Sequence, residues 1–286
     1  MSLRMSPPRV FPETTGAAKP PMGAAGSADT YRQTGFVLGN EVDAILRGLE
    51  VEGAAAEASA GAKFRTPRMV AAMGLWSRAW LARQSALHAV QWGAYSSALP
   101  LLRSAVDYQC AEIALLGDDQ PEWQAYLDDG GIALAPEQHA TEFKLHAFRS
   151  GSVMAAHPVL GEAYRVLTDL SMPHFGTTLL VTASESDPSR VAMTFGDRDF
   201  QLGMAELCVG FAASVGSAQL ETLLDNADVF ALDGTDVLEA AVSGLKTLVS
   251  RPDRCRVELI EVDGISRYLV HNFRRAPGGA PKRVLL

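Results

Sequence analysis

The feature that most constrains the fold is a long helical stretch that begins at Thr66-Pro67. Threonine suits the N-cap of a helix, and proline suits the first helical position because its missing N–H would have no partner there. Apolar residues then recur at steps of four and three residues to about Gln91, as expected of a helix with one buried face. This stripe consists of Met69, Met73, Trp76, Trp80 and Leu87.

Polar residues fall on several of the apolar stripes. Arg83 lies in line with the two tryptophans, and we expect it at the edge of the core with its guanidinium in water, because long cationic side chains commonly extend that way. Gln109 falls within the next predicted helix and must find hydrogen bonds if it is buried. Glu206 must be protonated or paired if it is buried, and is ordinary if it faces solvent.

Further helices are predicted on both sides of this stretch. The expected segments are 31–50, a helix within 93–119 capped by Ser96 or Ser97, 121–128, a helix opened by His157-Pro158, 200–224 and 235–250. Their apolar residues recur with the same helical period. The sequence therefore predicts a mainly α-helical protein built as a helical bundle.

Two β-hairpins are expected beside the bundle. The stretch TTLLVTASESDPSRVAMTFG has two β-prone runs around the turn signal SDPS, which favours a peripheral hairpin. The stretch CRVELIEVDGISRYLVHNF favours a C-terminal hairpin, because Asp263-Gly264 suits a type I′ turn. With that turn one face is predicted to lie on the helices; it carries Val257, Leu259, Tyr268 and Val270.

Three regions are expected along the chain. Residues 1–29 are dense in Pro, Gly, Ala and Ser, which favours a disordered arm. Residues 30–273 form a single helical domain with the two hairpins, and residues 274–286 form a basic flexible tail.

Composition excludes several classes of function. The net charge of −8 opposes general binding to nucleic acid or anionic membranes. Cys110, Cys208 and Cys255 are too few and too widely spaced for a disulfide framework or a thiolate zinc site, which suits a reducing cytoplasm. We see no export signal. The apolar stretch 202–220 contains Glu206 and Gln219, so we expect a buried helix there and no membrane span.

The common hydrolase, nucleotide-binding and di-iron motifs are not present in the sequence. One candidate metal site is HATEFKLH, in which His139, Glu142 and His146 would share a helical face as metal ligands or an acid–base set. The alternative is a solvated face, because the two histidines would lie about 10 Å apart along the helix axis. No cofactor can be assigned.

A second candidate site joins Arg103, Asp107 and His174. The stripe formed by Leu160, Tyr164, Leu167 and Ser171 reaches His174 with a further step of three, and Pro173 would kink or end the helix there. We expect His174 to line a pocket close to Arg103 and Asp107. The alternatives are a hydrogen-bonded structural histidine and an ordinary surface ion pair between Arg103 and Asp107.

These residues also carry a resemblance. Leu101, Leu102, Arg103 and Ser104 precede Asp107, and Leu170 and Ser171 precede His174. In this respect the central half of the chain resembles uncharacterised bacterial helical-domain families, in which a Leu-Leu-Arg-Ser segment is followed by an acid and a later Leu-Ser segment by a histidine. Asp107 stands where those families have glutamate. The resemblance implies no known activity.

We therefore expect a binding or assembly module. Self-association into a homo-oligomer is predicted because Trp76, Trp80 and the 202–220 helix offer apolar surface, and a small-molecule ligand is compatible with such a bundle. The alternative is a hydrolase-type enzyme, which could use a metal. His174 would be its base, Asp107 would orient the imidazole and Arg103 would hold an anion.

Overall fold

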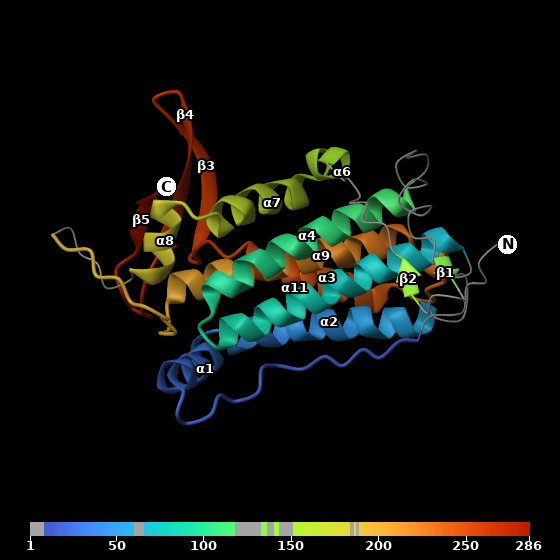
Figure 1. The fold of residues 1–286 in the computed structure, drawn as a ribbon, viewed down its shortest axis with the longest axis horizontal. Coiled ribbons are helices and arrows are strands. Elements are labelled where there is room, and N and C mark those ends of the chain that lie inside the picture. The colour runs from blue at the N-terminus through green and yellow to red at the C-terminus, as the bar shows by residue number, and fades with distance from the viewer. Residues whose placement is uncertain are drawn as a thin grey trace.

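The computed structural model describes residues 9–59, 66–117, 133–135, 140–142, 151–183, 186 and 189–286. The fold is mainly α-helical with a small antiparallel sheet near the C-terminus, as the sequence predicts (Figure 1). The helices are α1 (Ala25–Val37), α2 (Gly39–Ser59), α3 (Pro67–Gln91), α4 (Tyr95–Leu116), α6 (Gly151–Ala156), α7 (Pro158–Ser171), α8 (Phe175–Thr182), α9 (Leu202–Asp225), α10 (Ala227–Phe230) and α11 (Asp236–Val249). The strands are β1 (Ala133–Ala135), β2 (Ala140–Glu142), β3 (Arg256–Val262), β4 (Ile265–Phe273) and β5 (Lys282–Leu285).

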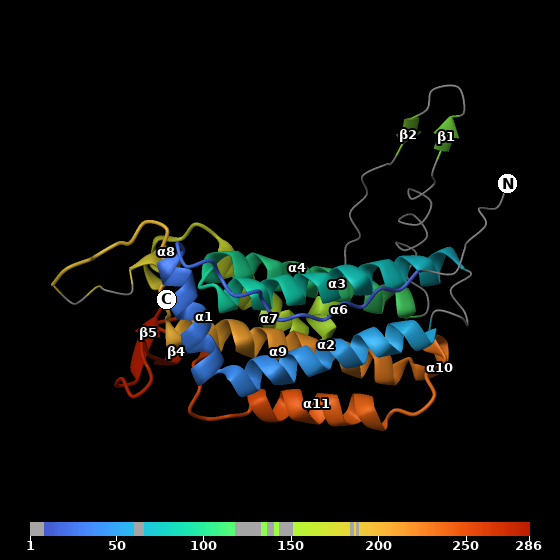
Figure 2. The same ribbon diagram turned by 90° about the horizontal axis from the view of Figure 1, so that it is seen from below.

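Helix α9 forms the centre of the bundle. It contacts α2, α3, α4, α7 and α11, and α3 and α4 pack along each other as an antiparallel pair (Figures 1 and 2). Among the described residues, α9 is the one helix long and apolar enough to cross a membrane. However, 72% of its most apolar 18-residue stretch is buried inside the protein. Its many small residues allow the neighbouring helices to approach closely, which suits a core helix.

The helix starts follow the predicted local chemistry. The Thr66 hydroxyl accepts a hydrogen bond from the backbone N–H of Met69 at 3.3 Å, and α3 ends at Gln91 as expected. The His157 Nδ1 atom accepts from the N–H of Leu160 at 3.3 Å and caps α7. Helices α9 and α11 also begin and end close to the predicted positions.

The C-terminal hairpin has the predicted register. Val257 pairs with Val270 and Leu259 with Tyr268, so these four residues share the face that lies toward the helices. Val270 is fully buried in the core, and the Tyr268 hydroxyl donates to the Asp169 carboxylate of α7 at 2.5 Å. Apolar contact and a charged hydrogen bond to α7 therefore fix the sheet to the bundle.

Glu206 of α9 is buried and paired, which is one of the two outcomes expected for it. Its carboxylate accepts from the N–H of Cys255 at 2.8 Å and lies 3.6 Å from Arg274. Burial raises the pKa of this carboxyl, while these partners oppose the rise. Glu206 thereby links the central helix to the start of the sheet.

Several expectations are wrong. Residues 175–182 form helix α8 and not a strand of the hairpin around SDPS, because tertiary contacts override β propensity: Leu180 is buried in the core. The helix expected over 31–50 is two helices, α1 and α2. Part of the arm expected to be disordered belongs to α1, and the tail contains β5, which pairs with β4.

Candidate ligand-binding site

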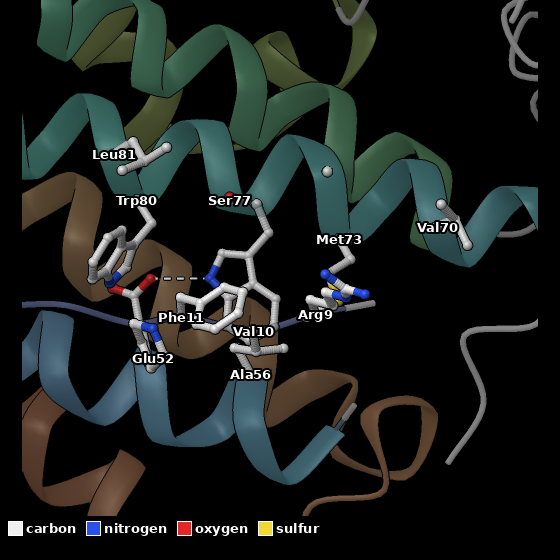
Figure 3. Close-up of a pocket in the computed structure, with 14 residues that line it drawn as sticks. Arg9, Val10, Phe11, Glu52, Ala56, Val70, Met73, Ser77, Trp80 and Leu81 are labelled. Atoms are coloured by element: carbon white, nitrogen blue, oxygen red, sulfur yellow. Dashed lines mark hydrogen bonds between the residues drawn. The ribbon is translucent and has the colours of Figure 1, made fainter. Parts of the chain in front are cut away.

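A cavity of about 390 Å³ lies between α2 and α3. Its walls carry aromatic and aliphatic side chains, as the close-up shows (Figure 3). The lining residues are Arg9, Val10, Phe11, Pro12, Glu52, Gly53, Ala56, Val70, Met73, Gly74, Trp76, Ser77, Trp80 and Leu81. Its volume falls within the range of about 300–1,000 Å³ typical of small-molecule sites.

The buried part of the cavity is built around Glu52. Its carboxylate accepts two hydrogen bonds from Arg83, one from Nη1 to Oε1 at 2.6 Å and one from Nη2 to Oε2 at 2.5 Å. The Trp76 indole donates to the same carboxylate at 3.1 Å, and the Trp80 indole donates to the carbonyl of Leu49 at 2.9 Å. The expectation that Arg83 lies at the core edge is therefore wrong: a buried carboxylate supplies the partner that lets it enter the core.

A second polar pair lies behind this one. The Gln219 amide of α9 donates to both carboxylate oxygens of Glu112 at 3.1 and 2.9 Å, and both side chains are fully buried. Burial raises the pKa of Glu112 to about 8. Neither polar atom of the buried Gln109 side chain has a hydrogen-bond partner among the described residues, so the hydrogen bonds expected for it are not found there.

The N-terminal strap, residues 9–24, forms the outer wall of the cavity with its first four residues, 9–12. It runs along α2 and α3 (Figure 2). The N–H of Ala17 donates to the side-chain oxygen of Gln91 at 2.9 Å, and the Trp92 indole donates to the carbonyl of Ala18 at 2.8 Å.

At the cavity the strap approaches α2 so closely that a Cβ at Gly53 would lie 2.6 Å from Pro12. The strap is therefore packed on the bundle, unlike the disordered arm that its composition favours.

The chemistry of the cavity favours an uncharged ligand. Met73, Trp76 and Trp80 offer apolar and aromatic surface, while the charge of Glu52 is already balanced by Arg83. Arg9 lies at the exposed side of the cavity, whereas an additional full charge in the buried part, beside the balanced Glu52–Arg83 pair, would lose its hydration. The exposed hydroxyl of Ser77 and the Glu52 oxygens can accept a hydrogen bond near the apolar walls.

The residues of the predicted Arg103, Asp107 and His174 site lie on α4 and at the start of α8. Arg103 donates to the Thr168 hydroxyl at 3.1 Å and to the Tyr164 hydroxyl at 3.0 Å, and it lies 4.0 Å from Asp107. The helix ends before Pro173, and His174 becomes the N-cap residue of α8. Its side chain is exposed and does not line the cavity described above.

The predicted metal ligands fall in a part of the chain that is largely not described. His139 and His146 lie outside the described residues. Glu142 belongs to strand β2, which spans Ala140–Glu142. The prediction of a continuous helix through these three residues is therefore wrong. Strand β2 pairs antiparallel with β1, and Ala133 lies opposite Glu142.

The sequence predicts Met73, Trp76 and Trp80 as residues of the apolar core, whereas in the structure they also line a cavity. A usable signal was Arg83 on the same stripe, because a cation among tryptophans requires a carboxylate from another helix. Its partner is Glu52, in an alanine- and glycine-rich segment that lies outside the helices predicted from the sequence.

No protein-family model, curated protein or solved structure matches this chain.

Proposed function

We propose that this protein binds a small, uncharged and largely apolar molecule between α2 and α3. The observation that carries the proposal is a cavity walled by Met73, Trp76 and Trp80, with the neutralised Glu52–Arg83 pair at its buried side. Fixed aromatic surface with few polar groups is the usual composition of a small-molecule site. The proposal develops the expectation of a binding module.

The proposal includes a cytoplasmic location. Its support is that Cys110, Cys208 and Cys255 are all free and buried in the structure. Burial raises the pKa of each thiol, to about 12 for Cys110. Buried thiols of this kind suit a reducing compartment and act as small apolar core residues.

The test uses N-phenyl-1-naphthylamine, an uncharged aromatic probe whose fluorescence rises in apolar surroundings. We expect saturable binding to the full-length protein, with energy transfer from Trp76 and Trp80. The blocking variant is Gly74→Leu, because Gly74 lines the cavity and a Cβ there meets no atom within 4 Å. The added side chain can fill the site without removing a protein contact.

The matched control is Gly244→Leu on α11, where a Cβ also meets no atom within 4 Å and which is not part of the cavity. We expect Gly74→Leu to weaken binding by at least about tenfold, equivalent to about 1.4 kcal/mol, and Gly244→Leu to leave it unchanged. Absence of saturable binding by the wild type, or equal binding by Gly74→Leu, contradicts the proposed site.

A further inference from the structure

The two ends of the bundle carry opposite charge. Residues 221–239 contain six carboxylates and no lysine or arginine. These residues, the acidic end, are Glu221, Asp225, Asp228, Asp233, Asp236 and Glu239. They lie at the end of α9, in α10, in the segment between α10 and α11, and at the start of α11; Glu221 among them is paired with Lys246 of α11.

The opposite end presents the uncovered face of the C-terminal sheet. Its register places one set of side chains away from the helices, and this outer sheet face consists of Arg256, Glu258, Ile260, Val262, Ile265, Arg267, Leu269, His271, Arg283 and Leu285. The three arginines are exposed. Glu258 is the one carboxylate of this set, and it is engaged with His271 at 2.7 Å and with Arg256 at 3.8 Å. The outer sheet face is therefore basic although the chain as a whole is acidic.

The two patches cannot meet within one molecule. Helix α9 starts beside the sheet, where the N–H of Leu202 donates to the carbonyl of Arg275 at 3.0 Å, and it ends at the acidic end. Its 24 residues span about 36 Å at about 1.5 Å per residue. Figure 2 shows α10 at one end of the bundle and β4 and β5 at the other.

Each patch also carries exposed apolar side chains. Val237 on α11 is 64% exposed and Val229 is 36% exposed at the acidic end. Leu285 is 46% exposed on the outer sheet face, and Ile265 is 57% exposed at the hairpin end of the sheet. Surface ion pairs alone contribute little to a stable interface. Exposed apolar side chains beside the opposite charges can supply the additional stabilisation when the two patches meet.

We infer that the outer sheet face binds the acidic end of a second copy of this chain, head to tail. The net charge of −8 disfavours contact between most faces of two copies, but at physiological salt the repulsion is screened beyond about 8 Å, so local complementarity decides. The contact joins two different patches, and it therefore extends into open chains of molecules unless the geometry closes a ring. It replaces the predicted reason for self-association, because Trp76, Trp80 and most of α9 are buried.

The experiment is sedimentation velocity of the full-length protein over a concentration series, at about 0.05 M and about 0.5 M NaCl. At low salt we expect association that increases with protein concentration, and at high salt we expect this association to weaken. Two charge-reversal variants test the patches: Arg256→Glu with Arg267→Glu, and Asp233→Lys with Asp236→Lys. Each variant alone should stay monomeric.

Mixing the two variants supplies the decisive result. One then has two acidic ends and the other two basic ends, so their equimolar mixture should associate again. The matched controls reverse exposed charges on α2 and α3, with Arg47→Glu and Arg78→Glu in one protein and Asp43→Lys and Glu50→Lys in another. These controls should associate like the wild type, and all variants are checked for an unchanged unfolding midpoint.

Three outcomes overturn the inference. The first is a wild type that stays monomeric at low salt, and the second is association that persists in both patch variants. The third is binding of a fluorescent single-stranded DNA by a monomeric wild type, lost in the Arg256→Glu and Arg267→Glu variant, which would assign the sheet face to nucleic acid. None of these results depends on the cavity between α2 and α3.

Discussion

Arg83 of α3 and Glu52 of α2 form a two-pronged ion pair in the interior, with side chains that are 2% and 1% exposed. The pair connects two helices at the point where the cavity reaches the core. Because the guanidinium and the carboxylate are both shielded from water, each charge is balanced by the other. The pair therefore shapes the cavity and makes this part of the bundle intolerant of single substitutions.

Replacing Arg83 with methionine is expected to lower the free energy of unfolding by about 3–5 kcal/mol, because Glu52 is left buried without its counter-charge. Urea unfolding measures the effect. The double variant Arg83→Met with Glu52→Leu should recover much of the loss. A single-variant cost as small as that of the exposed Arg47→Met change, within about 0.5 kcal/mol, would contradict a buried pair.

Glu112 is expected to make stability depend on pH. Burial raises its pKa to about 8 from the ordinary value of 4.5. Between these two pH values the folded protein binds more protons than the unfolded chain, so the free energy of unfolding falls as pH rises from about 4.5 to about 8 and then levels off.

The matched variant for this effect is Glu112→Gln, which keeps the shape of the side chain and removes its ionisation. Urea unfolding across the pH range should show that the wild type loses up to about 1.4 kcal/mol per pH unit more than the variant. Parallel curves for the two proteins would show that Glu112 ionises in the folded state as it does in the unfolded chain.

Two helical glycines are expected to respond to alanine with opposite sign. A Cβ at Gly216 would lie 3.2 Å from Arg83 Nη1, so Gly216→Ala should destabilise the protein by about 1–3 kcal/mol through overpacking against the ion pair. Gly244→Ala, at an open position on α11, should stabilise it by up to about 1 kcal/mol through helix propensity. Thermal unfolding of both variants checks the prediction, which fails if Gly216→Ala is neutral or stabilising.

Arg103 and His174 are expected to differ in their contribution to stability. Arg103→Met removes hydrogen bonds to Thr168 and Tyr164 between α4 and α7 and should cost about 1–3 kcal/mol. His174→Ala removes an exposed imidazole and should stay within about 0.5 kcal/mol. Chemical unfolding distinguishes them. Equal large losses would instead indicate that the two residues act together, as the sequence predicts.

The sequence by itself determined the elements whose signals are local. Thr66 and Pro67 specify the start of α3 because capping and proline geometry act within one helical turn. Asp263 and Gly264 specify the C-terminal turn because both adopt positive φ, at 52° and 74°. The alternation of β3 and β4 then decides which face of the sheet lies on the bundle, since side chains point to opposite faces in turn.

Only the tertiary structure decided the features that join distant segments. Arg83 enters the core because Glu52 meets it from α2, 31 residues away, and no local pattern contains that pairing. The strap lies along α3 because Gln91 and Trp92 bond its backbone, which composition cannot show. Helix α8 forms where its residues favour a strand, because burial against the bundle outweighs a propensity difference of about 1 kcal/mol. The candidate cavity follows from the same long-range contacts, since its walls come from two helices and a strap that meet only in the folded chain.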